Sequence, residues 1–145
     1  MNLVAPSPAA IWPLIAHGWR RAAFWAWLAG MGTVALFSLS PNLGPPKGFG
    51  MDKMDKIVHC AGYMVLALQT QPVFSKRRAA LIAALAMIPF GIAMEIGQVF
   101  VPGRSADSFD ALANSAGALM GIALSPAFRK LCARVTVSVG SYFAR

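Results

Sequence analysis

Residues 22–39 read AAFWAWLAGMGTVALFSL, a run that contains no charged side chain. A helix needs about 20 mostly apolar residues to cross a bilayer, so this run predicts a membrane-spanning helix. The rest of the chain agrees, because 57% of its 145 residues are hydrophobic and only 12% are charged. Soluble domains carry about 25% charged residues. The sequence therefore predicts an integral membrane protein.

Three more apolar stretches follow the first. We expect an all-α membrane protein, a bundle of four transmembrane helices at residues 22–39, 53–74, 79–100 and 109–124. Pro89 lies near the middle of the third helix and should kink it. Ala113, Gly117 and Gly121 recur at four-residue spacing in the fourth, which predicts a face where another helix approaches closely. Ser108 is expected to cap the start of that helix.

The expected organisation has three parts: an N-terminal interfacial segment at 1–21, a transmembrane domain at 22–124 and a basic C-terminal tail at 125–145. Pro6, Pro8 and Pro13 should break a helix in the first part. Trp12 and Trp19 are expected there at the headgroup level, the zone that tryptophan favours. The tail is expected either along the membrane surface or in an extended form.

Basic residues set the expected orientation. One side of the bundle receives Arg20, Arg21, Lys76, Arg77, Arg78, Arg129, Lys130, Arg134 and Arg145. The other side receives Lys47, Lys53, Lys56 and Arg104. Because cytoplasmic loops carry the excess of lysine and arginine, both termini are expected in the cytoplasm, in a multi-pass protein of the bacterial cytoplasmic (inner) membrane. The net charge of +8 is read as this signal, and no nucleic-acid partner is expected.

Polar residues gather in the outer halves of three predicted helices. Asp55, His59 and Tyr63 follow one another at four-residue spacing, so they share a helical stripe. Glu95 and Gln98 lie three apart on the third helix, and Asp110 and Asn114 lie four apart on the fourth. Arg104 lies in the loop between these two helices. Inside a bilayer such groups normally face the bundle interior or a water-filled cavity, so we expect one outward-facing polar pocket.

Structural roles stay open for the same residues. Asp55 could cap its helix and balance Lys56, and His59 could be an interior histidine bonded to Glu95 or Asp110. Arg104 and Asp110 could form a structural ion pair that closes the loop. Tyr63 could belong to the interfacial aromatic belt, and the amides of Gln98 and Asn114 commonly join helices.

The strings DKIVHCAGYMVLAL (55–68) and EIGQVFVPGRSADSFDALANSAGALMG (95–121) resemble the VanZ-like family of bacterial integral membrane proteins. The resemblance covers about residues 22–124. The matching positions are Asp55, Lys56, His59, Tyr63, Glu95, Gln98, Pro102, Gly103, Arg104, Asp110, Asn114 and Gly117. The namesake of the family is associated with low-level resistance to the glycopeptide teicoplanin. The resemblance thus implies a small membrane protein that works at the cell envelope.

Two hypotheses for function follow, and whether the protein is an enzyme stays open. In the first, it acts on a lipid or a lipid-linked envelope precursor by activating water or transferring a proton. The candidate catalytic residues are then His59, Glu95 and Asp110, and the candidate substrate-binding residues are Asp55, Tyr63, Gln98, Arg104 and Asn114.

In the second hypothesis, the same pocket binds or shields an envelope ligand without chemistry. Membrane lipids are expected partners in both cases. No cofactor is expected, although a divalent cation at Asp55 and His59 remains an open alternative.

Overall fold

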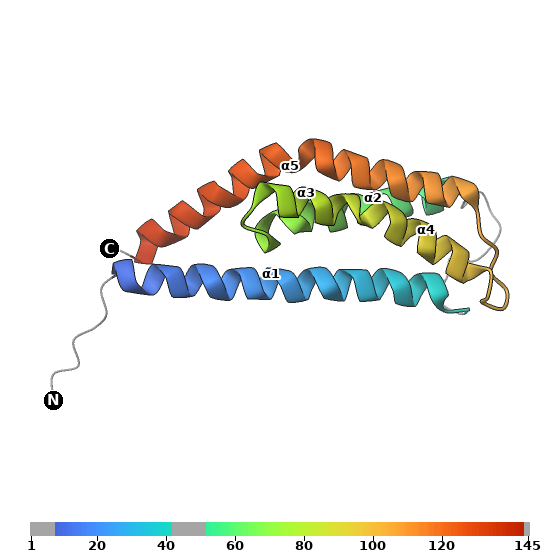
Figure 1. The fold of residues 1–145 in the computed structure, drawn as a ribbon, viewed down its shortest axis with the longest axis horizontal. Coiled ribbons are helices and arrows are strands. Elements are labelled where there is room, and N and C mark those ends of the chain that lie inside the picture. Colours follow the sequence, from blue (N-terminus) through green and yellow to red (C-terminus); the bar gives the residue numbers. More distant parts are fainter. Residues whose placement is uncertain (1–7, 42–51, 144–145) are drawn as a thin grey trace, which may run out of the picture.

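The computed structural model describes residues 8–41 and 52–143, and their side chains over 17–41 and 54–135. Within these ranges the chain is helical and contains no strand. The helices are α1 (Pro8–Leu39), α2 (Asp52–Val73), α3 (Arg77–Leu85), α4 (Met87–Gln98) and α5 (Ser108–Phe143). Figure 1 shows α1 and α5 as two long helices that flank the other three. Both ends of the described chain lie at one end of the bundle, and the loop between α4 and α5 lies at the other.

Helix α1 starts earlier than predicted. It begins at Pro8 rather than at residue 22, so the prolines do not end it. Pro8 occupies the first helical position, where a backbone N–H would have no partner in the helix anyway. Pro13 removes one backbone hydrogen bond in the second turn, and the helix continues through it. Trp19 is exposed on this helix, whereas the side chain of Trp12 and the whole of Pro6 lie outside the described residues.

The third predicted helix is divided into α3 and α4 at Ala86. Pro89 has no N–H to donate to the carbonyl of Leu85, so one rung of the helical hydrogen-bond ladder is missing. The ladder resumes at once, because the N–H of Phe90 donates to Ala86 O at 3.1 Å. The helix is therefore interrupted three residues before Pro89, as a proline in this position would cause, whereas the predicted kink angle stays a prediction.

Helix α5 is longer than predicted. It extends from Ser108 to Phe143, so residues 125–143 are neither extended nor separate from the helix. Pro126 lies inside it, and Figure 1 shows that α5 bends in its C-terminal half. The predicted cap at Ser108 is wrong by one position. The carboxylate of Asp107 accepts a hydrogen bond from the Phe109 N–H at 2.8 Å, which is the geometry of an N-cap.

Three stretches are long and apolar enough to cross a membrane: His17–Leu39, Arg77–Gln98 and Ser108–Val135. Helix α2 is not among them, because charged residues open it and Gln69, Thr70 and Gln71 lie near its end. The bundle also exposes large apolar side chains all around, for example Trp25, Leu36, Ile82, Ile96 and Leu119. A soluble bundle would bury such residues. The chain is therefore an all-helical membrane protein.

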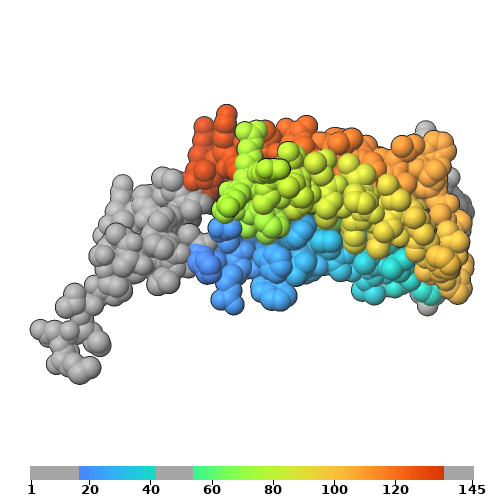
Figure 2. Space-filling model, in the orientation of Figure 1, coloured from blue at the N-terminus to red at the C-terminus, as the bar shows by residue number. Residues whose placement is uncertain are grey.

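Helix α2 packs along α5 and α1, and among the described residues it contributes more buried hydrophobic side chains than any other helix. In Figure 2 the visible face consists of α1, α3, α4 and α5. The predicted small-residue face of α5 is confirmed. A Cβ atom added to Gly117 would collide with the backbone carbonyl of Cys60, and one added to Gly121 would lie 2.6 Å from Met64 O. The absence of these side chains lets the two helix backbones touch.

Basic side chains secure the end of the bundle where α2 turns into α3. Arg20 on α1 donates to Val73 O at 3.2 Å, and Arg129 on α5 donates to Phe74 O at 3.0 Å. The carbonyl groups at the end of α2 have no partners within their own helix, so the two arginines satisfy acceptors that would otherwise be left open. Arginines distant in sequence are thereby brought to the same end.

Candidate functional site

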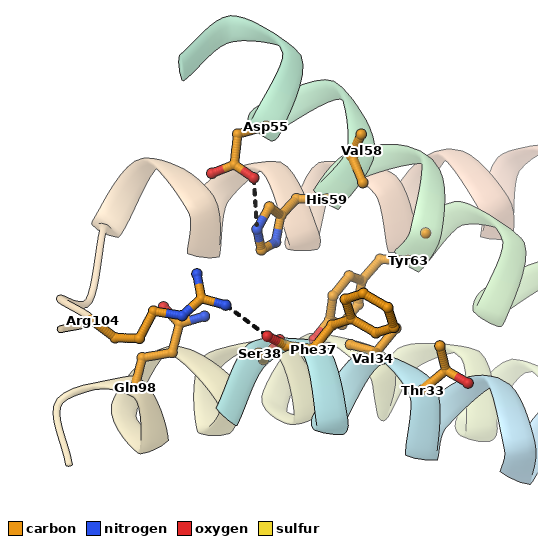
Figure 3. Close-up of a pocket in the computed structure, with 11 residues that line it drawn as sticks. Thr33, Val34, Phe37, Ser38, Asp55, Val58, His59, Tyr63, Gln98 and Arg104 are labelled. Atoms are coloured by element: carbon orange, nitrogen blue, oxygen red, sulfur yellow. Dashed lines mark hydrogen bonds and ion pairs between the residues drawn. The ribbon is translucent and has the colours of Figure 1, made fainter. Parts of the chain in front are cut away.

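A pocket of about 260 Å³ lies at the other end of the bundle, between α1, α2 and the loop after α4. Five of the predicted site residues line it: Asp55, His59, Tyr63, Gln98 and Arg104. Figure 3 shows these side chains converging from α2 and from the α4 side onto α1. The predicted meeting of polar stripes from separate helices is therefore present in the structure, although the boundary of the pocket differs from the expected one.

The wall formed by α1 is what sequence reasoning missed. Thr33, Val34, Phe37 and Ser38 line the pocket, yet they belong to the uncharged run that was read only as a span. The two hydroxyl groups in this apolar run were the available signal, and it was weak. Ser38 is buried, and Figure 3 shows it beside Phe37 on the α1 side of the pocket.

The loop sequence P-G-R positions Arg104. Gly103 has a φ of +79°, a backbone conformation that residues with a Cβ atom rarely adopt. The tight turn it makes is closed by the Arg104 N–H, which donates to Val101 O at 3.0 Å. The Arg104 guanidinium then reaches α1 and donates to Phe37 O at 2.6 Å. Its Nε lies buried with no hydrogen-bond partner among the described residues.

A chain of hydrogen bonds runs inward from His59. Its Nδ1 lies 3.0 Å from Asn114 Oδ1, and Asn114 Nδ2 donates to Glu95 Oε1 at 3.4 Å. The second oxygen of Glu95 accepts the Asp107 N–H at 3.3 Å. Asn114 is only 1% exposed and Glu95 is also buried. Helices α2, α4 and α5 are thus joined behind the pocket, since Glu95 and Asn114 do not line it.

Lys56 joins two aspartates. Its Nζ lies 2.9 Å from Asp107 Oδ2 and 2.9 Å from Asp110 Oδ1. In the loop, the hydrogen bond from Lys56 holds the pKa of the Asp107 carboxyl below its usual range, and the Phe109 N–H acts in the same direction. A depressed pKa stabilises the fold above the unfolded-state pKa, and this contribution is lost as the pH falls through the folded value. The bridge is therefore intact at neutral pH.

Three structural alternatives are corrected by these contacts. Asp110 pairs with Lys56 rather than with Arg104, whose guanidinium instead bonds a carbonyl of α1. His59 contacts Asn114 and Asp55, not Glu95. Asp55 follows the start of α2 by three residues and lies 3.6 Å from His59 Nε2, so it neither caps the helix from its first position nor balances Lys56.

Tyr63 is buried, at 2% exposure, and its hydroxyl has no hydrogen-bond partner among the described residues. The ring packs against Phe90 and close to Gly91, where an added Cβ atom would lie 3.0 Å from the tyrosine ring. Buried hydroxyl groups are normally satisfied. The Tyr63 hydroxyl and Arg104 Nε are thus two buried donors, on residues that line the pocket, for which the described residues supply no acceptor.

One group of side chains has the composition of a metal site. A carboxylate oxygen of Asp55, one of Asp110 and a ring nitrogen of His59 all lie within 4.8 Å of one another. Asp55 and His59 line the pocket, and Asp110 is buried beside them on α5. All eight predicted site residues are thus close together, five at the pocket and three behind it.

Comparison with protein families gives one match. The family model described as VanZ/LLP1 matches residues 23–129, which include the whole of the site and the loop that carries Arg104. No curated protein and no solved structure matches the chain.

Proposed function

This chain belongs to the VanZ/LLP1 family, and from that premise we propose that it binds a lipid or lipid-linked molecule of the cell envelope in the pocket and acts on it. The observation that carries the proposal is the two-sided lining of the pocket. Phe37 and Val58 on the rim are 51% and 64% exposed, whereas the floor carries the buried Tyr63 and Gln98. An amphipathic ligand fits such a lining, because acyl chains would contact the rim while a polar headgroup reaches the floor.

The headgroup end of the pocket supports an anionic ligand. The guanidinium of Arg104 and the hydroxyl of Tyr63 both present donors there, and arginine binds phosphate and carboxylate groups well. His59 lines the same pocket and is the candidate base. Glu95 and Asp110 act behind it, Glu95 by holding Asn114 against the imidazole and Asp110 by holding Lys56.

A second function, binding without chemistry, is favoured by one specific observation. Of the three candidate catalytic residues, only His59 lines the pocket. A module that shields an envelope ligand needs the donors of Arg104 and Tyr63 but no exposed carboxylate. This reading and the enzymatic one share the ligand class and differ in whether the ligand leaves unaltered.

We further propose four transmembrane helices in the cytoplasmic (inner) membrane, with both termini in the cytoplasm. Helix α2 has 22 residues, enough to span, and the polar side chains of Thr70 and Gln71 near its end are buried. The end where Arg20 and Arg129 meet the α2–α3 turn is the basic one, and the excess of basic residues in cytoplasmic loops supports assigning it to the cytoplasmic side. The pocket then opens toward the outer leaflet, where a link to teicoplanin resistance has a physical basis.

Lipid mass spectrometry of cells that express His59→Gln tests the catalytic role. Loss of a general base slows a reaction about 100-fold, so the lipid change that the wild-type protein causes should disappear. His17→Gln is the matched control, because His17 is exposed and lies on α1 sixteen residues before Thr33, the first residue of that helix that lines the pocket. It should behave like the wild type, and teicoplanin susceptibility should follow the lipid change in all strains.

If the His59→Gln and His17→Gln proteins are present at equal levels and both yield the same unaltered lipid, the protein binds the lipid without acting on it. If no lipid differs between cells with and without the protein, and none co-purifies with it, both readings fail.

Cysteine labelling tests the orientation. The two native cysteines, Cys60 and Cys132, are first replaced by alanine. Ser105→Cys in the α4–α5 loop should react with a membrane-impermeant maleimide in right-side-out vesicles, and Ser75→Cys in the α2–α3 turn should react only in inverted ones. Both serines are exposed, so accessibility within the protein is matched. Labelling of both positions from the same side would contradict the four-span topology.

A further inference from the structure

We propose that Asp55, His59 and Asp110 form a binding site for a divalent transition-metal cation, of which Zn²⁺ and Mn²⁺ fit best. The three residues come from α2 and α5, so the site joins the two helices that form the centre of the bundle. The sequence left a divalent cation at Asp55 and His59 as an open alternative to having no cofactor, and the structure adds Asp110 as the third ligand. The site is compatible with ligand binding in the pocket but changes one role in the proposed function: with a cation on Nε2 and a proton on Nδ1, His59 is a metal ligand and not a general base.

The spacing of the ligand atoms suits a cation. Zinc lies about 2.1 Å from nitrogen and oxygen ligands in a tetrahedral arrangement, so neighbouring ligand atoms are about 3.4 Å apart. His59 Nε2 is already 3.6 Å from Asp55 Oδ1, and the three donor atoms all lie within 4.8 Å of one another. Side-chain rotations that bring the Asp110 oxygen closer by about 1 Å would close the group around an ion.

The orientation of His59 is set by residues outside the group. Asn114 uses its Nδ2 to donate to Glu95, so its Oδ1 is the atom that faces the imidazole. An oxygen in that place accepts, and His59 Nδ1 must therefore be the ring nitrogen that carries the proton. Nε2 of the singly protonated ring then presents a lone pair toward the Asp55 oxygen. A histidine that ligates a metal typically donates its other ring N–H to a fixed acceptor in this way.

Without a cation, a singly protonated ring places acceptor against acceptor, whereas a second proton on Nε2 makes this contact a His59–Asp55 ion pair; a metal ion would take the place of that proton. The lone pair of Nε2 faces a carboxylate of Asp55 at 3.6 Å, with a second carboxylate, that of Asp110, nearby. Lys56 is the one basic side chain bonded to the group among the described residues, and it divides its charge between Asp107 and Asp110. Asp110 has a second oxygen for a metal. Three aspartates against one lysine leave an excess of negative charge that a dication neutralises.

An independent observation indicates that a ligand enters here. Asp55 and His59 line the pocket into which Tyr63 also projects, and the buried hydroxyl of Tyr63 lacks a partner among the described residues. An ion held at the pocket wall keeps coordination positions directed into this space. A water or an anionic ligand on those positions provides an acceptor within the same pocket as the unpaired donor.

The ligand set selects the kind of metal. One imidazole with two carboxylates is softer than the all-oxygen sites of Mg²⁺ and Ca²⁺, and it lacks the thiolates that select Cu⁺. Imidazole nitrogen suits Zn²⁺, and carboxylate oxygen also suits Mn²⁺.

Metal content and calorimetric titration of the purified full-length chain test the proposal. The wild-type protein in detergent should bind one equivalent of Zn²⁺ or Mn²⁺ and retain it through gel filtration. Asp55→Asn and His59→Gln should each weaken the measured affinity at least about tenfold, since changes even outside the ligand set of metal sites cost that much. Mg²⁺ at the same concentration should not compete.

Asp107→Asn is the matched control. Asp107 contacts the same Lys56 ammonium at the same distance as Asp110, yet it is not among the three ligands. Its substitution removes one negative charge and keeps a capping oxygen for α5, so the affinity should stay within about threefold of the wild type. Absence of a bound equivalent in the wild-type protein would overturn the proposal. Equal losses in Asp107→Asn and Asp55→Asn would also overturn it, because they indicate diffuse attraction of the cation. Failure of metal binding leaves the lipid proposal standing.

Discussion

Replacing Gly117 with leucine should remove most of the folded protein from the membrane. A side chain at this position meets the backbone carbonyl of Cys60, which cannot rotate away as a side chain could. The α2 and α5 backbones must separate, and that separation also pulls apart the neighbouring contact between Gly121 and Met64. Overpacking of this kind costs about 3 kcal/mol, a large part of the stability of a small protein. Fluorescence-detected gel filtration and thermal unfolding in detergent measure the loss.

Ala116→Leu is the control for this change. Ala116 is the preceding residue of α5 and is exposed, so leucine there extends toward lipid without meeting another helix. It should leave the yield and the melting temperature near the wild-type values. If the Gly117→Leu and Ala116→Leu proteins have the same melting temperature, then α2 and α5 do not touch at this point.

Replacing Asn114 with alanine should destabilise the bundle and disorient His59 at the same time. The amide bonds His59 on one side and Glu95 on the other, and it is almost completely buried. Alanine leaves a buried carboxylate oxygen and a ring nitrogen without partners, which costs about 2 kcal/mol in total. The effect exceeds that of one ordinary interhelical hydrogen bond in a membrane, about 0.6 kcal/mol, because two partners on two helices are lost together.

Ser115→Ala distinguishes this network from a general loss of polarity. The Ser115 hydroxyl donates to Ala111 O within its own helix at 2.8 Å, so its removal breaks no contact between helices. Thermal unfolding of the two variants in the same detergent should give a clear difference, with Ser115→Ala close to the wild type. Equal melting temperatures for Asn114→Ala and Ser115→Ala would mean that the hydrogen-bond chain does not hold α2, α4 and α5 together.

The site residues could be predicted because bilayers make polar groups costly. Glu95 stands in an apolar run, and a helix that carries such a residue into a membrane must direct it inward. Helical spacing then placed Tyr63 and Asn114 on the same stripes as their neighbours. The partners could not be predicted in the same way. Whether Asp110 pairs with Arg104 or with Lys56 depends on the relative positions of the helices to within a few ångströms. The spacing of residues along one helix contains no information about those positions.

Sequence by itself determined the membrane environment, the helical class, the disturbance of the helix near Pro89 and a close-packing face at Gly117, although not which helix packs there. Each of these follows from local chemistry: apolar length, a missing N–H or a missing Cβ atom. The tertiary structure alone decided that Phe37 and Ser38 of α1 complete the pocket, that Asn114 orients His59, and that Lys56 lies between two aspartates. These features depend on how far one helix is rotated and shifted against another, because side chains from different helices meet only once packing has fixed that rotation and that shift.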